Sequence, residues 1–504
     1  MPIATKRELF NLIDSLTKGE KRNFTLFVQR SSKEELPMFN KLFELIDKFP
    51  EKEDAWYAQK MNIEAKQNYS NLKRHLYKQI IMSLRILHNT KRANIQVREY
   101  IDYAFILYGK GLYPQASKIL KLAKREAVKH HLNNSHYTIV EFQKMIESRH
   151  ITRHGPDQAV ELIEESTLIA ENLNSTMKAS NLRLEIHAYF IKNGHVKNEE
   201  ESAYFSAQFE NAVRELESAT GGLNQRVFAL QAKVWYFYTL NRFNESYEYA
   251  NDWVDLFDRF PELIQRDKDL YLRGFHYMLN SAYHLRNVEK HSIVLSRLES
   301  YRKMEYKSLN RNSQIVSFLY VHTGRLNNSI LKKDVSTGLL NIPKTMRRIN
   351  KYSSVLDEHR KQVFYFKIAW IYLMADHIKK SISYLNKIVH VHKTTLRSDL
   401  KVYAIIMFMM CHYSSKNLSA IEYIIRTFGK DLNDLNRAQS LAIQMFKDIV
   451  EAPLLGHRLI FKQALENLAR LKNDPYQKLS VNYLDVELWI KSKISNRTIA
   501  QLGQ

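Results

Sequence analysis

The sequence predicts an all-α protein in which pairs of helices are repeated along most of the chain. Glycine and proline are scarce, with 13 Gly and 9 Pro in 504 residues, well below the usual shares of about 7% and about 5%. Apolar residues make up 45% of the chain, so there is ample material for a core. Few helix breakers and a large apolar fraction favour long helices joined by short turns. The third observation is a pattern of small and apolar residues that recurs at a regular spacing.

The recurring pattern is clearest at Ala104, Leu107, Gly111, Tyr113, Ala116, Leu120 and Ala123. A second copy lies at Val234, Phe237, Asn241, Phe243, Ser246, Ala250 and Trp253. A third lies at Ala369, Tyr372, Asp376, Ile378, Ser381, Leu385 and Ile388. The shifts between these copies and several looser ones are multiples of a period of about 43 to 44 residues. Self-similarity at a fixed period of this size indicates stacked helical repeats.

Residues 1–97 lack the pattern and are expected to form an N-terminal helical cap domain. Its helices are predicted at 5–16, 18–30, 36–48 and 68–90. Thr17 precedes Lys18, Gly19 and Glu20, and its hydroxyl can cap the free N–H groups at the start of the second helix. The fourth helix carries most of the basic residues of this domain.

Residues 98–472 are expected to form a right-handed helical-repeat solenoid of nine helix pairs. The first helices are predicted at 98–110, 136–152, 177–193, 225–240, 267–284, 311–323, 361–374, 399–413 and 436–450. Their partners are predicted at 113–132, 156–173, 202–219, 243–258, 288–304, 343–358, 377–391, 417–430 and 455–472. Two links, 194–201 and 324–343, are longer than a tight turn. In residues 473–504, Asp474-Pro475 is expected to end the array, and a capping helix is predicted at 477–494, because a solenoid needs a cover for its last face.

The pattern resembles the tetratricopeptide repeat. The run Gly111-Leu112-Tyr113-Pro114-Gln115-Ala116 matches the family's turn followed by an aromatic and a small residue. The family period of about 34 residues is shorter than the period here, so this chain is similar to long-period members of uncharacterised bacterial type. The resemblance implies paired helices whose first members line a concave side that binds partners. It implies no catalytic activity.

Several function classes are disfavoured by composition. The single cysteine, Cys411, cannot form a disulfide framework or a cysteine-based zinc site. Gly109-Lys110-Gly111 lacks the third glycine and the preceding strand of a phosphate-binding loop. We therefore expect no catalytic site, metal or cofactor. The N-terminal run has no secretory signal, and no apolar run reaches about 18 residues, so we expect a cytoplasmic protein without a membrane span.

The charge is strongly positive, at +23, which favours an anionic partner. From Ala65 to Arg98 the chain has eight bases and no acid. On a helix, four of these bases share one face opposite a stripe of leucine and isoleucine. A solvated face normally mixes the two signs of charge. We therefore predict an anion-binding surface formed by Lys73, Arg74, Lys78, Arg85 and Arg92, extended by Lys118, Lys121 and Arg125.

Two further features concern binding. Lys344, Arg347, Arg348 and Lys351 form a later basic patch in an acid-free stretch, 335–356. In the tetratricopeptide comparison, Trp235, Phe366 and Trp370 fall at positions that line the concave groove. They predict either an aromatic groove for a hydrophobic peptide or a tightly wound solenoid whose groove is closed, and long helices favour the closed form.

The most consistent function is that of a non-enzymatic cytoplasmic adaptor or scaffold that binds a macromolecular partner, most simply a protein. The alternative is association with RNA, the ribosome or DNA through the cationic helix of the N-terminal domain. The N-terminal domain has no short turn followed by a helix bearing a base-reading set of residues. Any nucleic-acid binding is therefore expected to rest on phosphate contacts.

Overall fold

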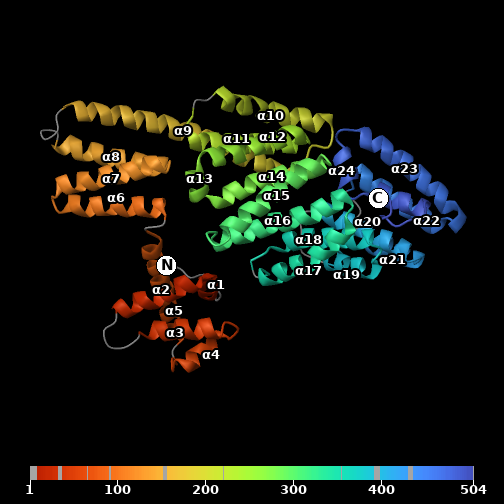
Figure 1. Cartoon of the computed structure of the whole chain (residues 1–504), viewed down its shortest axis with the longest axis horizontal. Helices are drawn as coiled ribbons and strands as arrows, with labels where there is room; N and C mark the ends of the chain where they lie inside the picture. Colours follow the sequence, from red (N-terminus) through yellow and green to blue (C-terminus); the bar gives the residue numbers. More distant parts are fainter. Residues whose placement is uncertain are drawn as a thin grey trace. The chain divides into compact units, whose positions relative to one another are not determined.

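The chain is α-helical throughout the part that the structure describes. The computed structural model describes residues 8–31, 37–64, 66–89, 92–150, 156–218, 221–353, 355–390, 398–429 and 435–502. Within these ranges there are 25 α-helices and no β-strand (Figure 1). The predicted all-α class is therefore confirmed. No described helix combines the length and the apolar character needed to cross a membrane.

The helices divide into two compact units, Met1–Asn174 and Ser175–Gln504. The first unit begins with α1 (Glu8–Ser15), α2 (Lys18–Ser31), α3 (Met38–Lys48), α4 (Asp54–Lys60) and α5 (Lys66–Asn89). The long helix α5 packs against α1, α2 and α3. Apolar side chains from all five helices form one core, which includes Leu9, Phe24, Leu42, Tyr57, Leu76 and Ile80.

The start of α2 confirms the predicted cap. Thr17 Oγ1 accepts a hydrogen bond from the Glu20 backbone N–H at 3.2 Å, and Glu20 Oε2 accepts one from the Thr17 N–H at 2.8 Å. This reciprocal pair is a capping box, which satisfies two N–H groups that the helix leaves free. The local sequence is therefore sufficient to fix where α2 begins.

The rest of the first unit contains α6 (Ala93–Gly109), α7 (Tyr113–Lys129), α8 (Asn133–His150) and the first half of α9 (Pro156–Asn193). Helix α6 packs against α7, and α7 against α8. Ala104 and Ala116 are fully buried in this core. Their small side chains let α6 and α7 approach closely, as the recurring pattern predicts.

The second unit contains the second half of α9 and sixteen further helices. These are α10 (Glu199–Ser218), α11 (Leu223–Thr239), α12 (Phe243–Arg259), α13 (Pro261–Arg266), α14 (Lys268–His284), α15 (Val288–Glu305), α16 (Arg311–Lys332), α17 (Val335–Lys351), α18 (Glu358–Met374), α19 (Ile378–Val389), α20 (Ser398–Ser414), α21 (Leu418–Thr427), α22 (Arg437–Glu451), α23 (His457–Asn473), α24 (Lys478–Tyr483) and α25 (Val486–Ile494).

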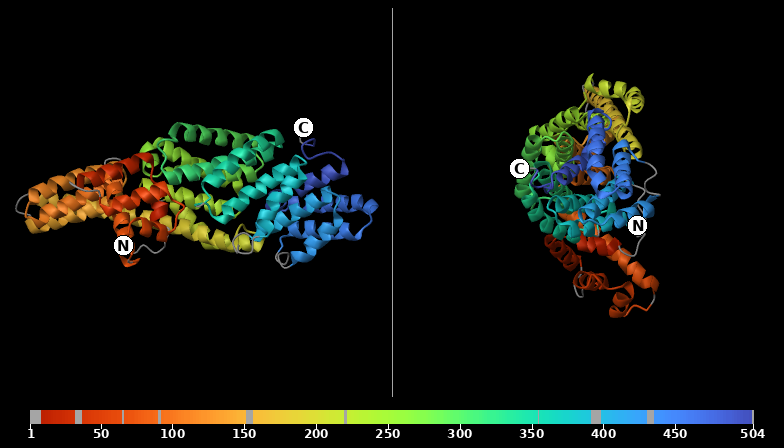
Figure 2. Two further views of the ribbon diagram at one scale, coloured as in Figure 1. Left: turned by 90° about the horizontal axis from the view of Figure 1, so that it is seen from below. Right: turned by 90° about the vertical axis from the view of Figure 1, so that its right-hand side faces the viewer.

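Successive helices of this unit pack in chain order. From α14 to α23 each helix contacts the next one. Helices α14, α16, α18, α20 and α22, the first members of their pairs, also contact one another in sequence. Figure 2 shows these helices, coloured green to blue, following one another side by side. The packing is repeat-like, with each pair burying its apolar faces against its neighbours.

The turn inside most helix pairs has the same backbone geometry. One residue in each turn has a positive φ, 73° at Gly111, 60° at Asn241, 57° at Arg286, 54° at Lys333, 59° at Asp376 and 57° at Lys416. The next residue donates its N–H to a carbonyl five positions earlier, as from Arg242 to Phe237 and from His377 to Tyr372. This is the Schellman motif, which satisfies carbonyls at the end of the first helix.

Two of the predicted links between helices are wrong. The predicted helices 156–173 and 177–193 are one helix, α9, because no glycine or proline interrupts the chain between Pro156 and Gly194. The predicted link 324–343 is instead the end of α16 and the first half of α17. Gly324 lies inside α16 for a packing reason, since a Cβ there would be 2.9 Å from Leu295 Cδ1. Pro343 lies inside α17 with its ring exposed to solvent.

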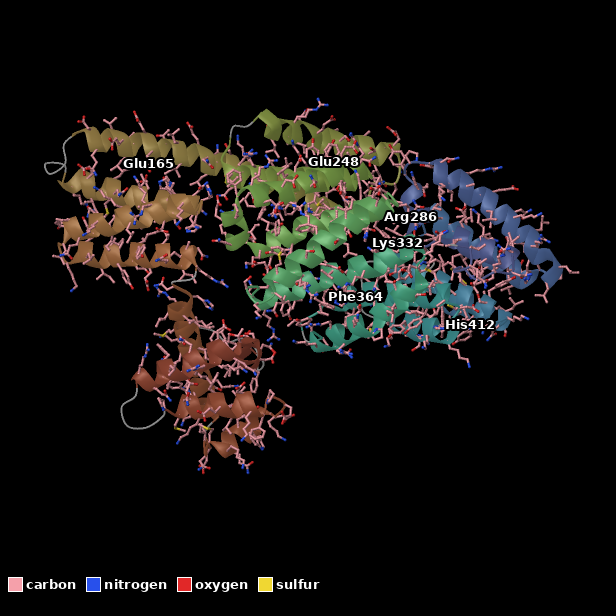
Figure 3. The ribbon with its side chains drawn as sticks, in the orientation of Figure 1. Glu165, Glu248, Arg286, Lys332, Phe364 and His412 are labelled. Carbon is pink, nitrogen blue, oxygen red and sulfur yellow. The ribbon has the colours of Figure 1, made fainter. Side chains whose placement is uncertain are left out.

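The C-terminal segment, residues 474–485, connects distant parts of the second unit. The Tyr476 hydroxyl donates a hydrogen bond to the Glu199 carboxylate, and Gln477 Nε2 donates to the Lys197 carbonyl at 3.2 Å. Arg286, labelled in Figure 3, donates to the Asn482 carbonyl at 2.8 Å. The segment thus joins the start of α10 to the turn between α14 and α15. Helix α25 then buries Trp489 completely.

Candidate binding surfaces

The predicted anion-binding surface lies on α5, α6 and α7 of the first unit. Arg74, Lys78, Arg85 and Arg92 are exposed, whereas Leu76 and Ile80 on the other side of α5 are fully buried. The predicted amphipathic character of α5 is therefore confirmed. Helix α6 packs against both α5 and α7, and Lys118, Lys121 and Arg125 of α7 are exposed as well.

Some charges of this surface are already compensated within the unit. Lys73 Nζ lies 2.7 Å from Asp54 Oδ2, and Lys73 is only partly exposed. Arg85 Nη2 lies 3.3 Å from Asp102 Oδ2, in an exposed pair. The cations best placed to meet an external anion are therefore Arg74, Lys78 and Arg92, with the three on α7.

The predicted groove residues lie inside the second unit. Phe366 is 6% exposed and Trp370 is 5% exposed. The Phe366 ring lies 5.7 Å from the ring of Tyr483 in the C-terminal segment. Trp235 is half-buried, and its ring lies 4.3 Å from that of His187 and 5.2 Å from that of Tyr277. These three side chains are packed inside the unit and offer little surface to a partner.

A third surface, which the sequence reasoning missed, is a cavity of about 360 Å³ in the second unit. Three arginines from different helices line it, Arg183 on α9, Arg266 on α13 and Arg273 on α14. The remaining lining residues are Asn224, Val227, Phe228, Gln231, Asp267, Asp269 and Leu270. Both acids are engaged, since Asp267 Oδ1 accepts a hydrogen bond from the Leu270 N–H at 3.0 Å and Asp269 Oδ2 accepts one from Asn312.

Arg183 is held rigidly at one side of this cavity. Its Nη1 donates to Gln231 Oε1 at 3.2 Å, and its guanidinium carbon lies 5.2 Å from the centre of the Phe228 ring. Its Nε is buried and has no hydrogen-bond partner among the described residues. Burial, and then the charge of Arg273, lower the pKa of Arg183. The Arg183 guanidinium is therefore a cation whose Nε donor has no partner among the described residues and whose neighbour, Arg273, is also a cation.

The positive charge continues along the first helices. The side chains of Arg273 and Tyr320 are hydrogen-bonded, and the Tyr320 ring stacks on that of His276 with centroids 4.2 Å apart. Burial lowers the pKa of His276 to about 3, and the charges of Arg273 and Arg360 add to the shift. Arg360 Nε lies 3.2 Å from Asp357 Oδ2 in an exposed pair.

These contacts define the arginine row, a line of polar side chains from five first helices. Its members are Arg183, Gln231, Arg273, Tyr320 and Arg360. In the sequence its arginines are isolated, with one on each of three helices, so no local run of charge marks them. The resemblance to tetratricopeptide repeats gives the one available signal, because it places Trp235, one turn after Gln231 on α11, among the groove positions.

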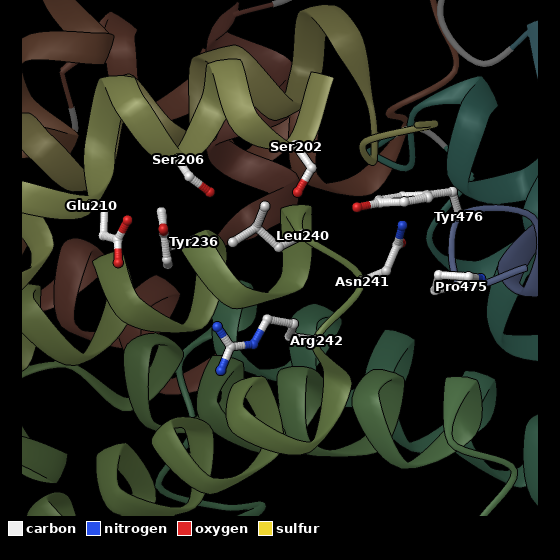
Figure 4. Close-up of a pocket in the computed structure, with 9 residues that line it drawn as sticks. All are labelled: Ser202, Ser206, Glu210, Tyr236, Leu240, Asn241, Arg242, Pro475 and Tyr476. Atoms are coloured by element: carbon white, nitrogen blue, oxygen red, sulfur yellow. The ribbon is translucent and has the colours of Figure 1, made fainter. Parts of the chain in front are cut away.

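A second cavity, of about 320 Å³, lies between α10, α11 and the C-terminal segment (Figure 4). It is lined by Ser202, Ser206, Glu210, Tyr236, Leu240, Asn241, Arg242, Pro475 and Tyr476. Most of its polar groups are engaged within the chain, although Asn241 Oδ1 has no hydrogen-bond partner among the described residues. Tyr476 is bonded to Glu199, Tyr236 to Ser206, and Arg242 Nε to Glu245 Oε1 at 2.7 Å. This cavity is a junction between structural elements.

Comparisons with known proteins add no family assignment. No protein-family model matches the sequence. No curated protein matches it either. Among the described residues, no group of three His, Cys, Asp or Glu side chains is arranged to hold a metal ion. Function must therefore be argued from the three surfaces themselves.

Proposed function

We propose that the protein is a non-enzymatic cytoplasmic adaptor that binds an acidic protein segment on the second unit. We further propose that its helix pairs form a tetratricopeptide-like right-handed solenoid. The packing of each helix from α14 to α23 on the next supports this architecture. In such an array, side chains on successive first helices form one continuous surface for an extended partner.

The arginine row carries the proposal. Arg183 and Arg273 line one cavity, and both acids of that cavity already accept hydrogen bonds within the chain. Guanidinium groups bind carboxylates through two parallel N–H···O bonds, and such charge-assisted bonds are among the strongest in proteins. A glutamate or aspartate side chain in the cavity would lie beside Arg183 and Arg273 and relieve the repulsion between the two arginines.

The test is binding of a fluorescent oligoglutamate peptide to the full chain, followed by anisotropy. The double variant Arg183→Gln, Arg273→Gln should lose at least about tenfold in affinity, since a hydrogen bond to a charged group is worth roughly 1.5–3 kcal/mol. Glutamine removes the charge without burying a new one, so the fold should persist. Circular dichroism of both proteins verifies this.

The matched control is Arg458→Gln, Arg470→Gln, which removes the same charge from exposed positions on α23. This variant should bind the peptide like the parent. Equal loss in both double variants would mean that the peptide responds to net charge alone, and it would contradict a site at the arginine row. Full affinity in the Arg183→Gln, Arg273→Gln protein would do the same.

A second candidate is nucleic-acid binding by the first unit. It is favoured by Arg74, Lys78 and Arg92, which are exposed and have no carboxylate partner among the described residues. Such a surface suits phosphates and does not read bases. Binding to RNA, duplex DNA or ribosomes should therefore be tolerant of sequence and should weaken steeply with salt.

Charge reversal tests this candidate. Changing Arg74, Lys78, Arg85 and Arg92 to Glu should abolish nucleic-acid binding, because all four side chains are exposed and their replacement leaves the α5 core intact. Electrophoretic mobility shifts and ribosome co-sedimentation at low and moderate salt measure the effect. Unchanged binding would place any nucleic-acid contact elsewhere on the chain. Absence of binding by the parent would eliminate the nucleic-acid candidate and leave the adaptor as the single proposed function.

A further inference from the structure

Three arginines converge on a second place in the second unit, apart from the arginine row. They are Arg302 on α15, Arg325 on α16 and Arg348 on α17, and the charges of all three act on the buried His322. Lys344 also acts on His322, and Arg347 and Lys351 are exposed on the same helix as Arg348. The acid-free stretch 335–356 thus supplies Lys344 and Arg348, and α15 and α16 supply Arg302 and Arg325.

Two tyrosines complete this arginine–tyrosine cluster. Tyr306 and Tyr352 are hydrogen-bonded to each other, and each is hydrogen-bonded to Arg348. The Arg302 guanidinium carbon lies 5.6 Å from the centre of the Tyr306 ring, and Lys351 Nζ lies 5.6 Å from the centre of the Tyr352 ring. The cations are therefore held in place by aromatic neighbours and by neutral hydrogen-bond partners.

Negative charge is scarce in the cluster. Glu299 accepts a hydrogen bond from Arg325 Nε at 2.6 Å. Glu305 is the other acid at this end of α15, and it is engaged by Lys268 Nζ at 3.1 Å. Arg302 Nε is buried without a hydrogen-bond partner among the described residues. The cluster thus has one carboxylate, paired with Arg325, for three guanidinium groups, and Arg302 Nε has no partner among the described residues.

The other groups of the cluster respond to this excess of positive charge. Burial, and then the charge of Arg348, lower the pKa of Arg302. Burial raises the pKa of Tyr306, but the hydrogen bonds to Arg348 and Tyr352 and the charges of Arg348 and Lys351 outweigh it and lower the pKa overall. The local field therefore favours the arrival of an anion.

We propose that the arginine–tyrosine cluster is a binding site for a phosphate monoester group. A monoester carries a charge of about −1.5 to −2 near neutral pH and three strong acceptor oxygens. These match several guanidinium donors and a phenol converging from three helices, where a carboxylate offers one charge and two oxygens. A nucleic-acid backbone offers a single charge at each phosphate, spread along a line, whereas this cluster is compact.

The site is independent of the arginine row, and its test uses the full chain. Isothermal titration is carried out with a phosphoserine peptide, with the same peptide bearing serine, and with inorganic phosphate. We expect the phosphoserine peptide to bind and the serine peptide to fail. Binding of inorganic phosphate with equal affinity identifies a small phosphate as the ligand, and tighter binding of the peptide identifies a modified protein. Both results support the site.

Variants locate the binding. Arg302→Gln and Arg348→Gln should each weaken it by at least about tenfold, as expected for loss of a charged hydrogen bond. Arg458→Gln removes the same charge from an exposed position on α23 and should have no effect. The Arg183→Gln, Arg273→Gln protein should also bind phosphate like the parent, so failure here is distinguishable from failure of the adaptor proposal.

A measurement on the unchanged protein covers the case in which a variant does not fold. Phosphate should raise the melting temperature of the parent above its value in a chloride buffer of equal ionic strength that contains neither phosphate nor sulfate. The reason is that a ligand of the folded state stabilises it by mass action. No stabilisation and no heat of binding would overturn the proposal. Binding of single-stranded RNA through Arg302 and Arg348, without binding of monoesters, would overturn it as well.

Discussion

His291 and His322 are buried neutral imidazoles in the second unit. His291 is 0% exposed and His322 is 4% exposed. His322 Nδ1 lies 2.8 Å from Thr345 Oγ1, and that hydroxyl donates its own proton to the Asn341 carbonyl. Thr345 therefore accepts from His322, which fixes the proton on Nδ1. Burial, reinforced by nearby cations, lowers the pKa to about 4 for His291 and to about 3 for His322.

These two histidines predict a loss of stability in mild acid. In the unfolded chain each imidazole binds a proton at about pH 6.5, whereas the folded chain resists protonation down to about pH 3 to 4. The unfolded state therefore binds more protons in this window, and the free energy of unfolding falls as the pH falls. The slope should approach about 1.4 kcal/mol per pH unit for each histidine.

Urea denaturation between about pH 7 and about pH 5 measures this effect. Ordinary carboxylates titrate mainly below this range, and burial raises the pKa of Asp252 and of Asp267 equally in parent and variant, so the difference between the two proteins reports His322. Replacing His322 with Gln keeps a polar partner for Thr345 and should make the slope shallower by about 1.4 kcal/mol per pH unit at most. The same pH dependence in parent and variant would show that His322 can take up a proton without unfolding the chain.

Ala369 lies at a close approach between two helices. Its side chain is fully buried, and its carbonyl accepts a hydrogen bond from Ser381 Oγ of α19 at 2.8 Å. Ala369→Leu should therefore overpack the contact and lower the free energy of unfolding by about 1–3 kcal/mol. Ala207→Leu makes the same change at an exposed helical position and should have little effect. Equal stability of the two variants would contradict the assigned helix contact.

At the scale of elements, the left-handed turn residue sets where each first helix ends. An L-residue in this conformation costs roughly 1 kcal/mol more than glycine. Lys416 has φ 57° and an exposed side chain. Lys416→Gly should therefore raise the free energy of unfolding by up to about 1 kcal/mol, as measured by thermal denaturation. Lys416→Ala keeps the strain and should give no gain. A gain with alanine would point to the lysine side chain instead of the backbone.

The sequence predicts most elements because each helix pair repeats the same apolar spacing, and Thr17 and Gly111 mark local boundaries. Helices α4 and α13 were missed, since seven and six residues are too few to show a period. Gly324 predicts a turn, because glycine breaks helices in isolation. In the structure, glycine is needed there because the Leu295 side chain of a neighbouring helix leaves no room for a Cβ. A contact between different helices is not visible in the local sequence.

The binding surfaces also divide into features visible in the local sequence and features created by contacts between helices. The cations of α5 and α7 could be predicted because they form local runs on single helices. Their neutralisation could not, since Lys73 pairs with Asp54, 19 residues away. The arginine row and the arginine–tyrosine cluster were missed because each draws single residues from several helices. Only the packing of those helices brings the guanidinium groups together.

At the scale of the whole molecule, the C-terminal segment links the end of the second unit to its start. Tyr476→Ala and Gln477→Ala together remove the bonds to Glu199 and to the Lys197 carbonyl. Backbone amides at the start of α10 should then exchange with deuterium faster, because local opening costs less free energy. Exchange in α16 should stay unchanged, since α16 packs against α14, α15, α17 and α18. Hydrogen exchange with mass spectrometry measures both, and unaltered exchange at α10 would contradict a stabilising role for the link.

The same link has a consequence for synthesis. Glu199 and Tyr476 are 277 residues apart in the chain, and a ribosome adds about 5–20 residues per second. Tens of seconds therefore separate the appearance of α10 from that of the residue that joins it. All of the arginine row is made before the C-terminal segment is made. A nascent chain thus has the whole row synthesised while the unit is still open at that end, so the acidic segment proposed above would find the row before the ends are joined.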